Sequence, residues 1–370
     1  MSKKLKVYVG MSGGVDSSLV TALLVEQGYD VTGVYMKNWT ADLPGVKCPW
    51  AEDLADAKRV AVQLGIDFKV FDFEKQYKHV VVDYMIDEYK KGRTPNPDVM
   101  CNQEVKFKLF LDAAMEDGAD MIATGHYAKV VDSSWYMVNS KKEADTHNLQ
   151  PTTYHLQCAV DENKDQTYFL YRITAQALSK TLFPIGEFTK PQVRKMAEKR
   201  GLTTAVKKDS QGICFVGQVG IRDFLSLYVD PKPGEIIDKQ SGKVLGRHDG
   251  AIFYTFGQRH GLDLGGGMPY YVVGKDMDKN EIYVTTDLND DNLWKKTINL
   301  TDLHWINLAP KDGKYKIRVR HRAPLVEAVL SPGDDNTLKL DLNQPERAIA
   351  PGQSVVIYDG DICLGGGIIT

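Results

Sequence analysis

Two cysteines stand in settings that favour a reactive thiolate. Cys101 follows the stretch GRTPNPDVM (92–100), whose two prolines stiffen a loop, and it stands just before a helix expected over 105–118. Cys214 follows a Ser-Gln-Gly turn and lies close to the lysine pair at 207–208. Positive charge and the N-terminal end of a helix both lower the pKa of a thiol, so each residue is a candidate nucleophile. The alternative for each is a small buried hydrophobic residue.

The other cysteines give no sign of a disulfide framework or a zinc site. We expect Cys48, Cys158 and Cys363 to be small buried residues, because the five cysteines are widely spaced and form no CxxC pair. This usage is typical of a reduced, cytoplasmic protein. We expect no secretory signal in the opening residues and no transmembrane segment. The net charge of −3 means that any binding of nucleic acid must come from local basic patches.

The stretch SGGVDS (12–17) follows an apolar run and precedes an expected helix. Its two glycines allow tight curvature and close approach of a ligand. Backbone N–H groups at the start of a helix attract anions, and serine hydroxyls can donate to phosphate oxygens. Asp16 suits such a site only if it orients donors or holds a metal, a role that Mg²⁺ carried by a triphosphate would give it. The spacing matches neither the Walker A nor the dinucleotide-binding pattern. A plain turn with a serine N-cap is the alternative.

The first third of the chain alternates strand and helix patterns that would position these residues. Strands are expected at 5–11, 30–39, 68–73 and 120–130, and helices over 15–27, 52–65, 77–92 and 105–118. This alternation predicts an α/β domain with a doubly wound parallel sheet, covered by helices on both faces. Ligands bind such sheets at the carboxyl ends of the strands, which is where SGGVDS falls.

Short, strand-like segments with many Gly and Pro residues dominate after about residue 211. We therefore predict an α/β catalytic domain over 1–210, a small β-rich central domain over 211–286 and a C-terminal β-barrel over 287–370. Residues 131–164 are polar and irregular, and we expect an insertion or a flexible loop there.

Two basic segments are candidates for binding RNA. In KYKIRVRHR (314–322) the cations occupy every second position, so a strand would place all of them on one face. They are Lys314, Lys316, Arg318, Arg320 and Arg322. A phosphate backbone would stabilise such a row of charges, although a solvated outer face is the alternative. The helix expected over 190–202 offers a second basic face, with the same alternative.

The turn SGGVDS resembles the PP-loop of the ATP pyrophosphatase superfamily, whose members adenylate a substrate and release pyrophosphate. Along essentially the whole chain, further motifs resemble those of the tRNA 2-thiouridylase (tRNA-uridine 2-sulfurtransferase) family. They include YMKNW, GRTPNPDVMCN, ATGHYA, KDQTYFL, DSQGICFVG, GLDLGG, RVRHR and PGQSVVIYDGD. The resemblance implies an N-terminal PP-loop domain of the adenine nucleotide alpha hydrolase-like type, followed by the two β domains. It also implies ATP-dependent 2-thiolation of the wobble uridine of tRNA.

The resemblance assigns a role to each candidate nucleophile. Adenylation turns the C2 oxygen of uridine into a leaving group, AMP. A persulfide on Cys214 is the nucleophile that carries the sulfur: its outer sulfur bonds to C2 and AMP leaves. Cys101 then attacks the sulfur–sulfur bond, which frees the thiolated base and leaves a Cys101–Cys214 disulfide for an external reductant to reset. Asp98 is a candidate general acid or base on the uracil. A turn-forming aspartate is the alternative for Asp98.

By the same resemblance, two further sets of residues bind the substrates. The ATP set is Gly10, Met11, Ser12, Gly13, Gly14, Val15, Asp16, Ser17, Met36 and Gly125. The residues expected to contact the target base are Asn96, Pro97 and Asp98. The other expected tRNA contacts are His126, Lys164, Asp165, Gln166, Arg320, His321 and Gln353. For His126 a structural role is the alternative.

The implied cofactors are ATP and Mg²⁺, and we expect no metal site built by the protein itself. The implied partners are the tRNAs for Lys, Glu and Gln and a cysteine desulfurase or sulfur-relay protein that donates the persulfide. Two other hypotheses compete: a 4-thiouridine-forming or other PP-loop adenylating enzyme, and an RNA-binding protein with a degenerate nucleotide site. The intact SGGVDS motif argues against the last of these.

Overall fold

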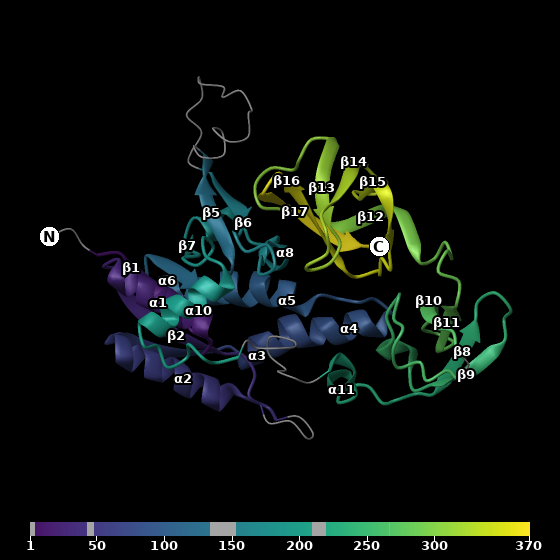
Figure 1. Ribbon diagram of the computed structural model, residues 1–370, viewed down its shortest axis with the longest axis horizontal. Coiled ribbons are helices and arrows are strands. Elements are labelled where there is room, and N and C mark those ends of the chain that lie inside the picture. The colour runs from purple at the N-terminus through teal and green to yellow at the C-terminus, as the bar shows by residue number, and fades with distance from the viewer. Residues whose placement is uncertain (1–3, 43–47, 134–152, 209–219, 266) are drawn as a thin grey trace.

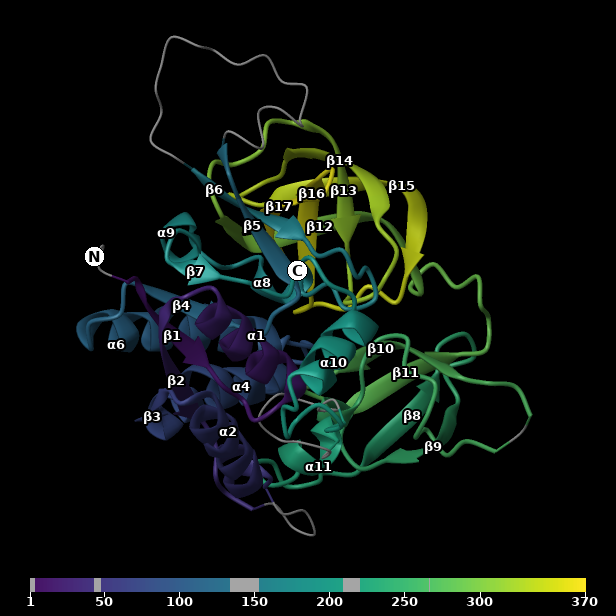
Figure 2. The ribbon, with the colours of Figure 1, turned by 60° about the vertical axis from the view of Figure 1, so that its left-hand side comes forward.

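The computed structural model describes residues 4–42, 48–133, 153–208, 220–265 and 267–370. An α/β domain, a small β domain and a barrel form three lobes (Figures 1 and 2). The barrel contains the C-terminus and lies above the other two lobes in both views. Within the described residues, no helix has the length and apolar character needed to cross a membrane.

A five-stranded parallel sheet forms the centre of the α/β domain, in the order β3-β2-β1-β4-β7. The strands are β1 (Lys6–Gly10), β2 (Asp30–Lys37), β3 (Asp67–Asp72), β4 (Met121–Thr124) and β7 (Thr181–Leu182). The chain runs outward in one direction from β1 to β3 and in the other from β4 to β7. The switch between β1 and β4 opens a crevice at the carboxyl ends of the strands. The predicted doubly wound parallel sheet is confirmed.

Helices cover both faces of this sheet. Three of them pack on the face that carries Val7 and Ala123: α1 (Val15–Glu26), α2 (Trp50–Leu64) and α10 (Lys190–Lys199). The opposite face, with Tyr8 and Ile122, packs against helical segments between residues 74 and 116. These are α3 (Glu74–Tyr77), a π-helical segment (Lys78–Asp83), α4 (Tyr84–Lys90), α5 (Pro97–Met100), a second π-helical segment (Cys101–Leu109) and α6 (Phe110–Glu116).

The helix that carries Cys101 begins earlier than its sequence pattern predicts. It starts at Pro97, where proline is favoured because the first helical residues need no N–H partner. The side chain of Asn96 caps it by accepting from the N–H of Val99, at 3.3 Å. The predicted start at 105 is therefore wrong, and Cys101 lies inside the helix, after its first turn.

The segment 120–130, expected as one strand, forms two strands in different sheets. After β4 the chain turns, and β5 (Ala128–Asp132) pairs with β6 (Tyr154–Cys158) in an antiparallel hairpin. Strand β6 pairs in turn with β17 of the C-terminal sheet. Residues that precede the central domain in sequence thus extend the barrel's sheet.

The expected irregular insertion over 131–164 is wrong at both of its ends. Residues 131 and 132 belong to β5, and residues 154–158 form β6. Two short helices follow, α8 (Thr167–Leu170) and α9 (Ala175–Leu178). The middle of the predicted insertion, 134–152, lies outside the described residues.

The two C-terminal lobes are built of β-strands, as predicted. After α11 (Ile221–Leu225), the central sheet has the order β10-β11-β8-β9. Its strands are β8 (Gly234–Asp238), β9 (Val244–His248), β10 (Tyr271–Asp276) and β11 (Glu281–Thr285). The barrel strands are β12 (Trp294–Trp305), β13 (Gly313–Arg318), β14 (Val326–Pro332), β15 (Leu338–Arg347), β16 (Ser354–Asp359) and β17 (Ile362–Ile369). The barrel closes because β12 pairs with both β15 and β17. The domain boundaries at 210 and 286 stay predictions.

A buried ion pair joins the barrel to the α/β domain. Arg318, at the end of β13, donates from an Nη atom to Asp165 at 3.1 Å, and the side chains are 12% and 2% exposed. Asp165 also accepts from the Ala159 N–H and the Thr167 hydroxyl. Burial raises the pKa of the Asp165 carboxyl, and the hydrogen bonds from Thr167 and Ala159, with the charge of Arg318, oppose that rise. The prediction that one strand carries five equivalent cations is therefore wrong, because β13 ends at Arg318 and Arg318 is paired with Asp165. Arg320 and Arg322 lie beyond the strand. The four cations other than Arg318 are exposed.

Replacing Arg318 by alanine is expected to lower the free energy of unfolding by about 3–5 kcal/mol, because it leaves the Asp165 carboxylate buried and without its cation. Urea titration followed by circular dichroism measures this. Lys314→Ala is the control, since Lys314 is exposed on the same strand and should change stability by less than about 0.5 kcal/mol. Equal effects of the two substitutions would show that the ion pair does not fasten the barrel.

Candidate active site

A cavity of about 320 Å³ lies where the ends of β1 and β4 meet. The chain after β4 approaches the first turn of α1 closely there: a Cβ atom added to Gly125 would lie 2.8 Å from the backbone nitrogen of Ser17. Seven of the ten predicted ATP residues line this cavity: Gly10, Met11, Ser12, Asp16, Ser17, Met36 and Gly125. The other three, Gly13, Gly14 and Val15, belong to the same turn and to the first residue of α1. The structure thus brings the predicted ATP set together.

The turn after β1 leaves the start of α1 open. Gly14 is the N-cap, and no side chain caps the helix. A serine N-cap, the alternative for this turn, is therefore wrong. The Ser17 hydroxyl accepts from the Ser12 N–H at 3.2 Å, and the Ser18 hydroxyl donates to the Gly14 carbonyl at 2.7 Å. Backbone N–H groups at an uncapped helix start bind anions well, so the turn suits a phosphate group.

The carboxylate of Asp16 is engaged by a cation rather than left open. Lys190 donates to both of its oxygens at 2.8 Å, and the Tyr127 hydroxyl donates to one of them at 2.9 Å. Within the described part of the chain, no group of three or more His, Cys, Asp or Glu side chains is placed to hold a metal ion. The uncapped start of α1, with Asp16 already neutralised by Lys190, would fit a nucleotide polyphosphate.

Three aromatic residues that line the cavity were missed from the sequence. Tyr35, Trp39 and Trp50 line it together with Met36. Flat rings beside a phosphate-binding turn suit the base of a nucleotide. Trp39 follows Met36 closely in the motif YMKNW and could have been found from it. Trp50 opens α2, and nothing in its local sequence marks it.

His126 is buried against the same cavity. It is 7% exposed, with Nδ1 at 2.7 Å from the Thr124 hydroxyl and Nε2 at 3.3 Å from Nζ of Lys106. Burial lowers the pKa of His126 well below its usual value, and the charge of Lys106 acts in the same direction. The ring is therefore neutral and fixed. Its expected contact with tRNA stays a prediction.

The predicted tRNA residues of the KDQ motif have different surroundings. Gln166 lines the cavity, and its side-chain oxygen accepts from the Tyr127 N–H at 2.9 Å. Asp165 is 3% exposed in the ion pair with Arg318. Lys164 is partly buried, near enough to His321 to influence its pKa. A contact of Asp165 with tRNA would require its network to open, and all three contacts stay predictions.

The residues expected to hold the target base lie at a second junction, where α5 meets α8 and two loops of the barrel. The rings of Phe169 and His321 lie 4.5 Å apart, and the Tyr168 hydroxyl donates to the carbonyl of Ser354 at 2.9 Å. The barrel loop at Gly352 presses on the chain before α5, since a Cβ there would lie 2.8 Å from the backbone nitrogen of Thr94. The junction thereby brings together Asn96, Pro97, Asp98, Arg320, His321 and Gln353, which are predicted tRNA contacts.

Two side-chain polar atoms at this junction are buried without a hydrogen bond in the described part of the chain. They are Nδ1 of His321 and Oε1 of Gln353. Such atoms cost about 1–3 kcal/mol each when buried alone, so a polar partner here would be favourable. Arg320 lies exposed beside them.

We expect His321 to remain neutral from pH 5 to pH 8. Burial lowers its pKa to about 4, and the charges of Arg322, Arg318 and Lys164 act in the same direction. Because an unfolded histidine has a pKa of about 6.5, the unfolded state takes up the proton first, and stability is lost as the pH falls below that value. NMR titration of the imidazole Cε1–H proton checks this. A midpoint at pH 6 or above would contradict it.

Cys101 lies beneath this junction, one turn after Asp98, and is 1% exposed in the core. Cys214 lies outside the described residues, so its pairing with Cys101 stays a prediction. Lys207, which precedes Cys214 in the chain, forms ion pairs beside the nucleotide cavity. It donates to Asp53 at 2.7 Å and also binds Asp56. Although burial opposes it, these hydrogen bonds raise the pKa of Lys207.

Comparison of the sequence with known proteins identifies the family of this chain. Family models for a tRNA methyl transferase HUP domain, a tRNA methyl transferase PRC-barrel domain and an aminomethyltransferase beta-barrel domain match residues 5–218, 222–286 and 295–369. The tRNA-specific 2-thiouridylases MnmA of Bacillus cytotoxicus and Bacillus thuringiensis are each 47% identical to the chain, over 98% of its length and 94% of theirs. The chain belongs to the tRNA-specific 2-thiouridylase family.

Membership of the 2-thiouridylase family confirms the resemblance carried by the sequence motifs, and with it the PP-loop domain and the two β domains that follow. Among solved structures, NMN synthetase from Francisella tularensis aligns with 57% of the chain and 68% of its own length, at 13% identity and a TM-score of 0.32. These values are too low to inform the function of this 2-thiouridylase.

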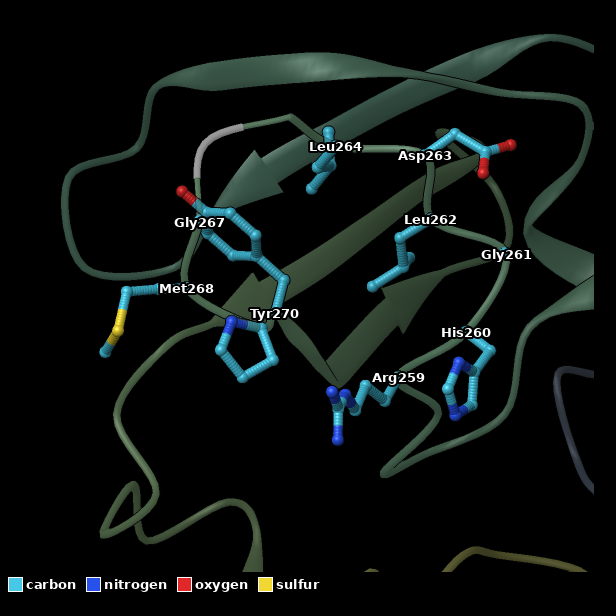
Figure 3. Close-up of a pocket in the computed structure, with 10 residues that line it drawn as sticks. Arg259, His260, Gly261, Leu262, Asp263, Leu264, Gly267, Met268 and Tyr270 are labelled. Carbon is cyan, nitrogen blue, oxygen red and sulfur yellow. The ribbon is translucent and has the colours of Figure 1, made fainter.

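A further cavity, of about 310 Å³, lies in the central lobe of this 2-thiouridylase (Figure 3). The loop that precedes β10 forms it and includes the motif GLDLGG. Arg259 and His260 lie along one part of the loop, and Met268 and Tyr270 lie along another. None of the residues around this cavity belongs to the predicted ATP or tRNA sets, and we assign it no role.

Proposed function

We propose that this protein uses ATP to replace the C2 oxygen of the wobble uridine of tRNA with sulfur, with the tRNAs for Lys, Glu and Gln as substrates. The observation that carries the proposal is the 47% identity to 2-thiouridylases over nearly the whole chain. The nucleotide cavity and the α5 junction supply the two binding regions that such a reaction needs. A 4-thiouridine-forming enzyme is not favoured, because the relatives are named 2-thiouridylases.

ATP would bind at the turn after β1. The open start of α1 would supply backbone N–H donors to its phosphates, and the aromatic residues that line the cavity suit the adenine ring. Mg²⁺ carried by the phosphates would neutralise their charge. Bound ATP supplies the adenylyl group that activates the uridine oxygen, and the cavity walls hold the nucleotide in place for that attack.

The wobble uridine would bind at the α5 junction, once it has left its stack. The unpartnered atoms of His321 and Gln353 and the side chains of Asn96 and Asp98 offer polar partners to a base or its backbone. Asp98 is one helical turn from Cys101, so an acid or base and a nucleophile share one helix. The persulfide on Cys214 and its donor, a desulfurase or relay protein, belong to the same proposal, as does a cytoplasmic location.

Thiolation of an unmodified tRNA for Glu tests the proposal. The reaction contains ATP, Mg²⁺, cysteine and a cysteine desulfurase, and retardation on a mercury-containing gel followed by nucleoside mass spectrometry reads the product. We expect an ATP-dependent 2-thiouridine at the wobble position. The same tRNA with cytidine at that position is the control and should remain unmodified. Sulfur on Cys214 with no modified tRNA, or sulfur at position 4 of a uridine, would overturn the proposal.

A further inference from the structure

The first residue of α10, Lys190, does not face solvent as its place on a basic helix suggests. Its side chain is 10% exposed, and Nζ lies 2.8 Å from both carboxylate oxygens of Asp16. The backbone fixes its position, because its N–H donates to Asp161 at 2.8 Å and Thr189 before it forms a capping box with Gln192. Lys190 is thereby held in one place by the start of its own helix.

The basic residues of this helix have different roles. Arg194 donates to the carbonyls of Ala205 and Lys207, whereas Arg200 pairs with Glu26. Lys195 and Lys199 are exposed. The expected basic face for RNA is thus reduced to two exposed lysines, and Lys190 contacts the nucleotide turn instead.

Asp16 needs a cation because of where it stands. It lies in the first turn of α1 and lines the cavity that suits a polyphosphate. A carboxylate there would repel the phosphates by Coulomb interaction in a partly desolvated site. Lys190 cancels that charge, while the Tyr127 hydroxyl, 2.9 Å away, helps to fix the carboxylate. The ammonium also lies 5.8 Å from the centre of the Tyr127 ring, a further favourable contact.

We propose that Lys190 is a positioning residue of the nucleotide site: it neutralises and fixes Asp16 so that the turn after β1 accepts a polyphosphate. Asp16 then acts as the partner of Lys190 rather than as a ligand of Mg²⁺. The inference rests on the proposed function, because it takes ATP as the ligand of this cavity.

Direct binding of ATP tests this, by calorimetry with Mg²⁺ and again in EDTA. Lys190→Gln should weaken ATP binding at least about tenfold under both conditions, since about 1.4 kcal/mol corresponds to a factor of ten. In thiolation assays it should raise the KM for ATP and leave kcat within about threefold. The control, Lys195→Gln on the exposed face of the same helix, should bind ATP as the unaltered protein does. Unchanged ATP binding by Lys190→Gln would overturn the proposal.

The double variant Asp16→Asn with Lys190→Gln separates the explanations. It leaves no unpaired charge, so its Kd for ATP should return to within about fivefold of the unaltered protein. ATP binding by the double variant also tests the proposal if the single variant Lys190→Gln does not fold. A loss of more than about fifty-fold in the double variant, or a loss seen only with Mg²⁺, would show that Asp16 binds the metal or the nucleotide directly. If the unaltered protein binds ATP but thiolates no tRNA, the proposed function fails and this inference is still decided by binding.

Discussion

Cys101→Ser is expected to lower tRNA thiolation by about 10³-fold or more, while tRNA binding and ATP-dependent release of pyrophosphate persist. A serine hydroxyl occupies nearly the same space as the thiol, but at neutral pH it is a very poor nucleophile toward a sulfur–sulfur bond. Cys101 is buried in the core, as the alternative for it expected, and its chemical role stays a prediction that this variant tests. The π-helical segment that begins at Cys101 is a rare geometry that is frequent at functional sites, and Asp98 precedes the cysteine by one turn.

Cys363, which is buried as predicted, and Cys158, which is only partly buried, serve as matched controls for this substitution. Burial raises the pKa of Cys158 to about 12 and that of Cys363 well above its usual range, so neither forms a thiolate at neutral pH. Cys158→Ser and Cys363→Ser should therefore keep thiolation within a few-fold of the unaltered protein. Retention of more than a tenth of the activity by Cys101→Ser would remove Cys101 from the mechanism. Mass spectrometry should also detect sulfur accumulated on Cys214 in the Cys101→Ser variant.

The sequence pattern predicted the α/β sheet well because each strand and helix there is encoded locally. Apolar runs separated by amphipathic helices dictate a parallel sheet, and the turn after β1 had to lie at its carboxyl end. The pattern failed at 120–130, where a segment expected to be one strand contains the turn from one sheet to another. The change of sheet depends on the pairing of β6 with β17, some two hundred positions apart in sequence. The local pattern of apolar residues does not indicate such a pairing.

The sequence predicted which residues lie at the candidate site, but it did not predict which charged residues pair with one another there. Lys164, Asp165 and Gln166 form a polar triplet that local sequence would place in solvent, yet Asp165 is buried against Arg318 from a distant strand. Lys190 was expected on an RNA-binding face for the same reason. An ion pair between residues far apart in sequence cannot be recognised in the local sequence around either residue. The burial of Asp165 and Lys190 could therefore not be predicted from the sequence alone.

Gly13→Ala is expected to weaken ATP binding by about 100-fold and to lower thiolation to match. Gly13 has a φ of +74°, a conformation that costs other residues about 1–2 kcal/mol. A Cβ atom there would also lie 2.3 Å from the backbone oxygen of Asp53, in the first turn of α2. Both penalties force the turn after β1 away from α2, and the N–H groups at the start of α1 then no longer converge on a phosphate.

Gly14→Ala is the matched control, one residue further along the same turn. Gly14 has a φ of −92°, and a Cβ there would meet only the Ser12 hydroxyl, at an ordinary 3.5 Å. As an N-cap, alanine in place of glycine should cost about 1 kcal/mol at most, so ATP binding should fall less than about tenfold. Calorimetry with ATP measures both variants, and tRNA binding reports whether each still folds. If Gly13→Ala bound ATP as well as Gly14→Ala, close approach of the turn to α2 would not shape the nucleotide site.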